Sequence, residues 1–200
     1  MDLNCAMCGI KACKNNIENA PNGCPSLNKD MKELVKEYGT EENIKIAQVS
    51  AILSCQKGKT RIEETMEFAN RCGYKKLGLA FCNALSNEAK IIDKVFKYNG
   101  FETASIMCKV GGISREEIGL DDNGVKLCNP IAQAKFLNES KTDLNIIIGL
   151  CIGHDSLFIK YSEAPVTVLA VKDRVLAHNP LGAIYLSESS YKNKLFPPKE

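Results

Sequence analysis

The sequence has no long apolar run, no excess of one charge and no export signal at its start. Its most apolar stretch, Leu144–Ile152, is far shorter than the roughly 20 residues of a membrane-spanning helix. The 26 Lys and Arg residues nearly balance 24 Asp and Glu and are spread along the chain, so no basic stripe predicts nucleic-acid binding. The opening MDLNCAMCGI lacks the basic and apolar regions of a signal peptide. We therefore expect a soluble, cytoplasmic protein.

Cysteine is the residue that the chain has in excess, with ten in 200 residues. In a short exported chain, such a number predicts a disulfide framework. In a reducing cytoplasm, clustered thiols more often bind metal or take part in chemistry. The composition therefore favours a metal-binding or thiol-reactive protein before any motif is considered.

Four of these cysteines lie in the first 25 residues, with the spacing C-x2-C-x4-C-x10-C. This pattern predicts a cysteine-rich metal knuckle, in which two thiolates of one tight turn and two from a short loop complete a tetrahedral set. Zinc and a [4Fe-4S] cluster suit four thiolates equally well, and the spacing does not decide between them. A reduced, unligated tail or disulfides are the alternatives. The predicted ligands are Cys5, Cys8, Cys13 and Cys24.

The remainder of the chain predicts an α/β domain. Residues 1–28 form the cysteine-rich module, and residues 29–200 form the domain, which is helical over 29–73, has β/α units over 74–184 and ends in an irregular tail over 185–200. Short apolar runs alternate with amphipathic segments, which favours parallel β-α-β crossovers. We expect a Rossmann-like three-layer sheet of four or five mostly parallel strands, preceded by the helical segment. The expected strands are Leu77–Phe81, Thr103–Cys108, Leu144–Leu150 and Val166–Val171.

A second group of cysteines coincides with the predicted strand ends. Because ligands of open parallel sheets bind outside the carboxyl ends of the strands, these side chains are expected at one edge. They predict either a second metal centre, such as a second iron–sulfur cluster, or a thiol active site with His154 as base. Burial as small core residues is the alternative. The candidate ligands are Cys82, Cys108, Cys128 and Cys151, and the candidate catalytic residues are Cys82, Cys108, Cys151, His154 and Asp155; Lys109, Lys172, Asp173 and Arg174 are expected nearby.

Other motifs are given structural interpretations. Cys55 and Cys72 lie in predicted helices and are expected in the core. The phrase GKT, ending at Thr60, lacks the first glycine of a phosphate-binding P-loop and follows a helix, so that motif is rejected. Ser114 and Glu117 after the glycine pair Gly111-Gly112 predict a turn and a capping box, with a glycine-rich anion loop as the alternative. His178 is expected in a polar loop.

Several phrases resemble one family, the cysteine-rich metal-binding proteins known as domain of unknown function 1847, found mainly in anaerobic bacteria and archaea. They are CAMCGIKAC with the later GCP, LGLAFC, MCKVGG, LCNPIAQA and GLCIGHDSLFIKYSEAPVTVLAVKDRVLAHNP. The resemblance covers nearly the whole chain. It implies metal binding by Cys5, Cys8, Cys13 and Cys24, and it implies no particular reaction.

Two functions follow from these predictions. The first is a metal-binding protein whose zinc or iron–sulfur site serves a structural, sensing or electron-transfer role. The second is an iron–sulfur or thiol enzyme that acts on a small anionic or sulfur-containing molecule at the carboxyl edge of the sheet. The expected partners are a metal ion and a small molecule or redox partner.

Overall fold

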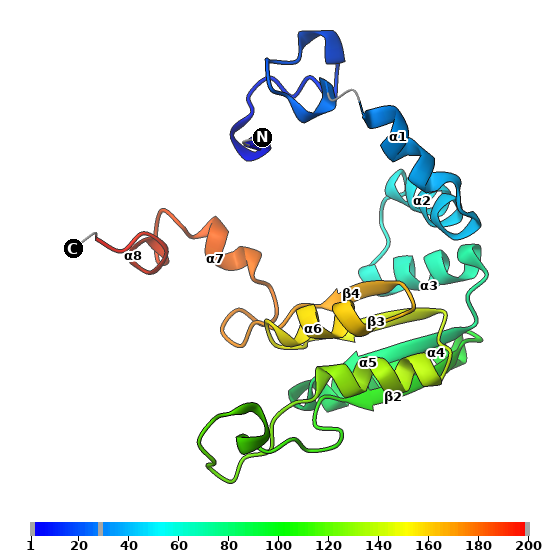
Figure 1. The fold of residues 1–200 in the computed structure, drawn as a ribbon, viewed down its shortest axis with the longest axis vertical. Helices are drawn as coiled ribbons and strands as arrows, with labels where there is room; N and C mark the ends of the chain where they lie inside the picture. The colour runs from blue at the N-terminus through cyan, green and yellow to red at the C-terminus, as the bar shows by residue number, and fades with distance from the viewer. Residues whose placement is uncertain (1–2, 28–29, 199–200) are drawn as a thin grey trace. The chain divides into compact units, whose positions relative to one another are not determined.

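The computed structural model describes residues 3–27 and 30–198 (Figure 1). The chain forms two compact units. The units are Met1–Lys57 and Gly58–Glu200. The division therefore falls inside the segment 29–73 that was expected to be helical, so its last helix belongs with the sheet.

The first unit begins with three short 3-10 turns, η1 (Cys5–Met7), η2 (Ile17–Asn19) and η3 (Pro25–Leu27). Within residues 3–27, Ala12 is the one buried side chain, so this segment has no apolar core of its own. Helix α1 (Met31–Lys36), turn η4 (Glu37–Gly39) and helix α2 (Glu41–Ser54) follow. Thr40 caps α2 by accepting the Asn43 N–H at 3.2 Å, as expected of a threonine at this position.

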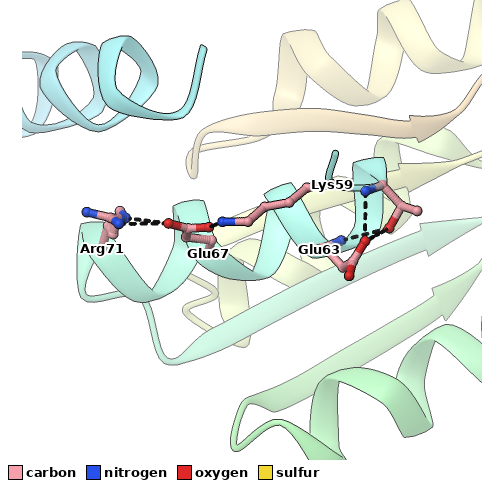
Figure 2. Close-up of polar contacts among 5 residues, drawn as sticks. Lys59, Glu63, Glu67 and Arg71 are labelled. Carbon is pink, nitrogen blue, oxygen red and sulfur yellow. Dashed lines mark hydrogen bonds and ion pairs between the residues drawn. The ribbon is translucent and has the colours of Figure 1, made fainter. Parts of the chain in front are cut away.

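Helix α3 (Arg61–Cys72) opens the second unit with a capping box. The Thr60 N–H donates to the Glu63 carboxylate at 2.7 Å, and the Thr60 hydroxyl accepts the Glu63 N–H, so two backbone donors are satisfied. Further along the helix, the carboxylate of Glu67 lies between the Lys59 ammonium and the Arg71 guanidinium (Figure 2). The GKT phrase thus precedes a capped helix and follows α2, which is consistent with rejecting a P-loop.

The sheet contains four parallel strands in the order β2-β1-β3-β4, which confirms the predicted α/β three-layer fold (Figure 1). The chain runs outward from β1 to β2 and then returns to the other side of β1, so the topological switch point lies between β1 and β3. The strands are β1 (Lys76–Phe81), β2 (Glu102–Met107), β3 (Leu144–Ile148) and β4 (Val166–Ala170). The crossover helices are α4 (Ser86–Tyr98), α5 (Pro130–Glu139) and α6 (His154–Tyr161).

Alternation along the strands divides the core into two layers. Leu77 and Leu79 of β1 pack with α3 and α4, where Phe96 is fully buried. Ala80 of β1 and Ile147 of β3 face the opposite way and pack with α5 and α6. Each face of the sheet is therefore covered by two helices, as an all-parallel sheet requires.

A buried polar group lies near the amino end of β3. Asn145 is fully buried; its Oδ1 accepts the Thr142 hydroxyl at 2.8 Å and its Nδ2 donates to the Ser162 hydroxyl at 2.8 Å. Gly78 is its partner on β1, and a Cβ at Gly78 would lie 1.9 Å from Asn145 Oδ1. Only glycine leaves room for this asparagine.

Connections and the carboxyl-terminal segment depart from expectation in small ways. The tail expected to be irregular contains a short helix, α8 (Lys192–Leu195), after α7 (Leu181–Tyr185). Cys72 is buried as expected, but Cys55 is exposed, because it caps the carboxyl end of α2 instead of lying within the helix. Turns η5 (Asn83–Leu85) and η6 (Glu116–Ile118) complete the elements, and the expected capping bonds between Ser114 and Glu117 are present.

Among residues 3–27 and 30–198, every helix is too short or too polar to cross a bilayer.

Candidate functional site

Cys82 and Cys108 lie side by side at the carboxyl edge of the sheet. Phe81 and Met107 are the last partners in the β1–β2 register, so the next residues of the two strands, Cys82 and Cys108, are opposite one another. The ladder continues there, because the Cys108 N–H donates to the Phe81 carbonyl at 2.9 Å. Strand alternation from Ala80 directs Cys82 into the α5/α6 layer, where Cys108 also packs.

Cys128 joins these two residues from the start of α5. The N–H of the next residue, Asn129, donates to the Cys108 carbonyl at 2.7 Å, and the Asn129 side chain caps α5 by accepting the Ala132 N–H. Cys128 packs against the same buried cluster and is half-buried. The structure thus brings three of the four predicted strand-end cysteines together; we name Cys82, Cys108 and Cys128 the edge thiols.

The electrostatic environment of Cys82 favours its thiolate. Burial raises the pKa of Cys82, but the neighbouring Ala84 N–H and the Lys172 ammonium lower it by more. The Cys108 thiol lowers it further as a hydrogen-bond donor, so the pKa of Cys82 lies below the ordinary thiol value. Lys172 lies in the loop after β4 and is one of the residues that the sequence predicts at this edge.

Cys108 has the opposite environment. Burial, together with repulsion from Cys128 and Cys82, raises the pKa of Cys108 to about 12 despite the favourable Asn83 N–H. That N–H lies 3.3 Å from Cys108 Sγ. The pKa values of these two neighbouring thiols are thus shifted in opposite directions, downward for Cys82 and upward for Cys108.

Cys151 was expected directly after the third strand, but β3 ends at Ile148, so Cys151 lies in the loop before α6, beside a different cation. The Arg174 guanidinium donates to Cys151 Sγ at 3.2 Å. The Cys151 carbonyl accepts the N–H groups of His154 and Asp155, at 2.9 and 3.1 Å, as α6 begins. In the described part of the chain, no hydrogen bond joins the His154 imidazole to a thiol, and the cation beside Cys82 is Lys172.

The loop that carries Lys172 and Arg174 is fixed by the residue between them. Asp173 Oδ1 accepts the N–H groups of Val175 and Leu176, at 2.9 and 2.8 Å. His178 Nδ1 accepts the Asp173 N–H at 3.1 Å, and the His178 N–H donates to the Asp173 carbonyl at 2.9 Å. His178 adopts φ +65°, which is uncommon for a residue with a side chain. The predicted loop position of His178 is correct, and its role is to hold the cation-bearing loop.

Gln133 of α5 is a site residue that the sequence did not indicate. It is fully buried, and its Nε2 donates to the carbonyls of Phe81 and Ile106, at 3.3 and 2.8 Å. Its Oε1 is buried without a hydrogen-bond partner in the described residues. Unsatisfied acceptors of this kind are rare in folded proteins and often mark functional positions. An amide in a helix carries no sequence signal that distinguishes it from a surface glutamine.

The amino-terminal cysteines lie in a segment of short turns. The Lys11 N–H is directed at Cys8 Sγ, at 3.4 Å, and Lys11 adopts φ +49°. Cys5 and Cys13 are exposed, while Cys8 and Cys24 are half-buried. Over the described ranges 3–27 and 30–198, no three His, Cys, Asp or Glu side chains lie where they could share one metal ion.

Fold and site together define a class: a three-layer parallel α/β protein with a thiol cluster at the carboxyl edge of its sheet. The chain belongs to the family described as protein of unknown function (DUF1847), whose model matches residues 24–169. The matched region includes Cys24 and the edge thiols and begins after Cys13. An uncharacterized protein of Methanocaldococcus jannaschii, MJ0455, is 47% identical over 190 residues, covering 92% of this chain and 94% of its own.

A solved structure resembles part of the chain at low similarity. It is a mutant N-acetyl-L-ornithine transcarbamylase complexed with carbamyl phosphate and N-succinyl-L-norvaline, 16% identical, with a TM-score of 0.37. The match covers 62% of this chain, which spans only 40% of the length of that protein.

Proposed function

We propose that the protein is a thiol enzyme that acts on a small anionic or sulfur-containing molecule at the carboxyl edge of its sheet. Cys82 is its nucleophile. The observation that carries this proposal is the position of Cys82 at the switch point between β1 and β3, beside the Lys172 ammonium and the Cys108 thiol. A thiolate beside a cation at a ligand-binding edge is the arrangement used by nucleophilic cysteines.

The charges at the edge support an anionic substrate. Lys172 and Arg174 reach the ends of β1 and β3 from a single loop, and each approaches a different cysteine. Cys82 is 7% exposed and Cys128 is half-buried, so the site suits a small molecule rather than a macromolecule. Gly149, directly after β3, leaves room for Leu85 at this edge, because a Cβ there would lie 2.2 Å from the Leu85 side chain.

The proposal is tested by labelling the native protein with limiting iodoacetamide at pH 6 after reduction and purification without oxygen. Most free thiols are protonated at this pH, so a thiolate with a lowered pKa takes the largest share of label. We expect peptide mass spectrometry to find that label on Cys82. Cys82→Ser should abolish it, whereas Cys55→Ser, which changes an exposed cysteine of the other unit, should not. Equal labelling of all accessible cysteines would contradict the proposal.

A second proposed function concerns the amino-terminal cysteines. Cys5, Cys8, Cys13 and Cys24 would bind zinc or a [4Fe-4S] cluster in a structural, sensing or electron-transfer role. The Lys11 N–H directed at Cys8 Sγ supports this, because thiolate ligands commonly accept backbone N–H bonds. The absence of an apolar core in residues 3–27 supports it too, since metal binding supplies folding free energy to such segments.

This second proposal is tested by metal and acid-labile sulfide analysis of protein purified without oxygen. We expect about one zinc ion per chain, or iron and sulfide in the ratio of one cluster. Replacement of the four cysteines by serine should remove the metal and leave the second unit folded. Full metal retention in that variant would refute the assignment.

A further inference from the structure

We propose that Cys82 and Cys108 form a redox-active dithiol and that the substrate is a disulfide. This inference rests on the proposed function, because it takes Cys82 as the attacking thiolate. It adds a second chemical role, that of Cys108, and a substrate class.

The register of the sheet places the two residues at a distance that a disulfide can span. Cys82 and Cys108 follow the paired residues Phe81 and Met107 in parallel strands. Adjacent strands are about 4.8 Å apart, which lies within the roughly 4.4–6.8 Å between the Cα atoms of bonded cysteines. Both side chains belong to the α5/α6 layer, so they share one side of the sheet. Bond formation therefore requires only side-chain rotation and small backbone adjustments.

The two residues differ in the ways that a reactive dithiol requires. Cys82 is the more exposed, at 7% against 2% for Cys108, and it has the Lys172 ammonium beside it. Cys108 is the more deeply buried of the two. The Asn83 N–H lies 3.3 Å from the Cys108 sulfur, where it can stabilise the thiolate that Cys108 becomes when it reacts. Cys82 is thus suited to attack an incoming molecule, and Cys108 is suited to resolve the product.

The reaction is two successive thiol–disulfide exchanges. Cys82 thiolate attacks one sulfur of the substrate disulfide, forms a mixed disulfide and releases the first substrate thiolate, which takes a proton from solvent. Cys108 then attacks Cys82 Sγ as its proton passes to the departing sulfur, which forms the Cys82–Cys108 disulfide and releases the second half of the substrate as a thiol. The substrate gains two electrons and the dithiol loses two. A low-molecular-weight thiol reductant returns the protein to the dithiol by the reverse exchange.

Cys128 offers Cys108 a competing partner, because it also contacts Cys108. It directly precedes Asn129, whose N–H donates to the Cys108 carbonyl at 2.7 Å. A Cys108–Cys128 bond would leave the Cys82 thiolate outside the redox pair. The two pairings give different peptides and are therefore distinguishable.

The test uses glutathione disulfide, a small anionic disulfide, added in excess to the reduced full-length protein without oxygen. After quenching with acid and alkylation, peptide mapping should find most of the protein with a Cys82–Cys108 linked peptide. Cys108→Ser should instead stop at a Cys82–glutathione mixed disulfide, whereas Cys128→Ser should behave as the unchanged protein. Circular dichroism confirms that each variant is folded, and the linkage in the unchanged protein requires no variant.

The alternative outcomes separate the two proposals. A Cys82–glutathione adduct that accumulates in the unchanged protein, without the linked peptide, would overturn the dithiol and leave Cys82 as a nucleophile. A Cys108–Cys128 linkage would overturn the dithiol as well. No modification of Cys82, together with no label at pH 6, would overturn both proposals.

Discussion

The two edges of the sheet differ in how completely their buried polar groups are bonded. At the amino edge, both the oxygen and the nitrogen of the Asn145 side-chain amide form hydrogen bonds. Asp143 Oδ2 accepts the N–H groups of Lys75 and Lys76, at 2.7 and 2.8 Å. At the carboxyl edge, Gln133 Oε1 has no partner in the described residues, and the pKa values of two adjacent thiols are displaced in opposite directions.

This difference indicates where the sheet is structural and where it acts. Saturated buried networks rigidify a fold and specify its register. Buried acceptors without a partner are rare, and thiols whose pKa values are shifted by burial and a neighbouring charge are candidates for functional sites. The amino edge therefore fixes the register of β1 against β3, whereas the β1–β2 ladder places Cys82 opposite Cys108 at the other end of β1.

The largest effect is expected from Gly78→Ala at the amino half. The new methyl would overlap Asn145 Oδ1, so the asparagine must move and its two buried hydrogen bonds weaken. We expect the free energy of unfolding to fall by about 3 kcal/mol, measured by urea denaturation. Gly182→Ala is the control, since its methyl would meet only the Leu176 side chain, at 3.3 Å. A change below about 1 kcal/mol would contradict the close packing of Gly78.

Smaller losses of unfolding free energy are expected when the two buried amide side chains, Asn145 and Gln133, are replaced. Asn145→Ala leaves Thr142 and Ser162 without their amide partner, and we expect a loss of about 2 kcal/mol in unfolding free energy. Gln133→Leu removes one unsatisfied acceptor along with its two donors, so a loss of only about 1 kcal/mol is expected. Equal losses would mean that the two edges do not differ in hydrogen-bond saturation.

The raised pKa of Cys108 predicts an alkaline loss of stability. Between pH 9, the ordinary thiol value, and about 12, the folded state keeps the Cys108 proton that the unfolded state has released. The unfolded state then binds fewer protons, so stability falls as pH rises through this window. Cys108→Ser should show a shallower decline in unfolding free energy over the same range. Identical slopes would show that Cys108 is not a buried, protonated thiol.

The most local effect is expected from Lys172→Met. Loss of the ammonium should raise the pKa of Cys82 and slow its alkylation at neutral pH, without unfolding the protein. Arg174→Met is the matched control from the same loop, because its guanidinium contacts Cys151 instead. A pKa of Cys82 that responds equally to both substitutions would assign the effect to general charge rather than to contact.

Much of the fold could be predicted because its signals are local. The alternation of short apolar runs with amphipathic segments predicts the four strands and the helices that connect them. Thr40 and Thr60 begin helices because their side chains cap the first turn. The strand-end position of Cys82 and Cys108 followed from the rule for parallel sheets. The position of Cys55, exposed rather than buried, could not be derived, because burial depends on which helix faces find partners.

The site was less accessible to sequence reasoning, since its decisive contacts join distant segments. Lys172 was expected at the edge of the sheet. That it lies beside Cys82 and not beside Cys151 depends on the conformation of its loop, which Asp173 and His178 hold. Gln133 carries no motif at all. Its importance appears only when its two donors are found at the ends of β1 and β2.

The most direct measurement is the pH profile of Cys82 alkylation in the native protein, compared with the same residue in denaturant. The midpoint reports the pKa, because restricted access of the reagent to the sulfur slows the reaction at every pH without moving the midpoint. The account predicts a native midpoint below the denatured one, with alkylation lost as pH falls through that lower value. A native midpoint equal to or above the denatured value would show that burial prevails, and Cys82 would then be a core residue rather than a nucleophile.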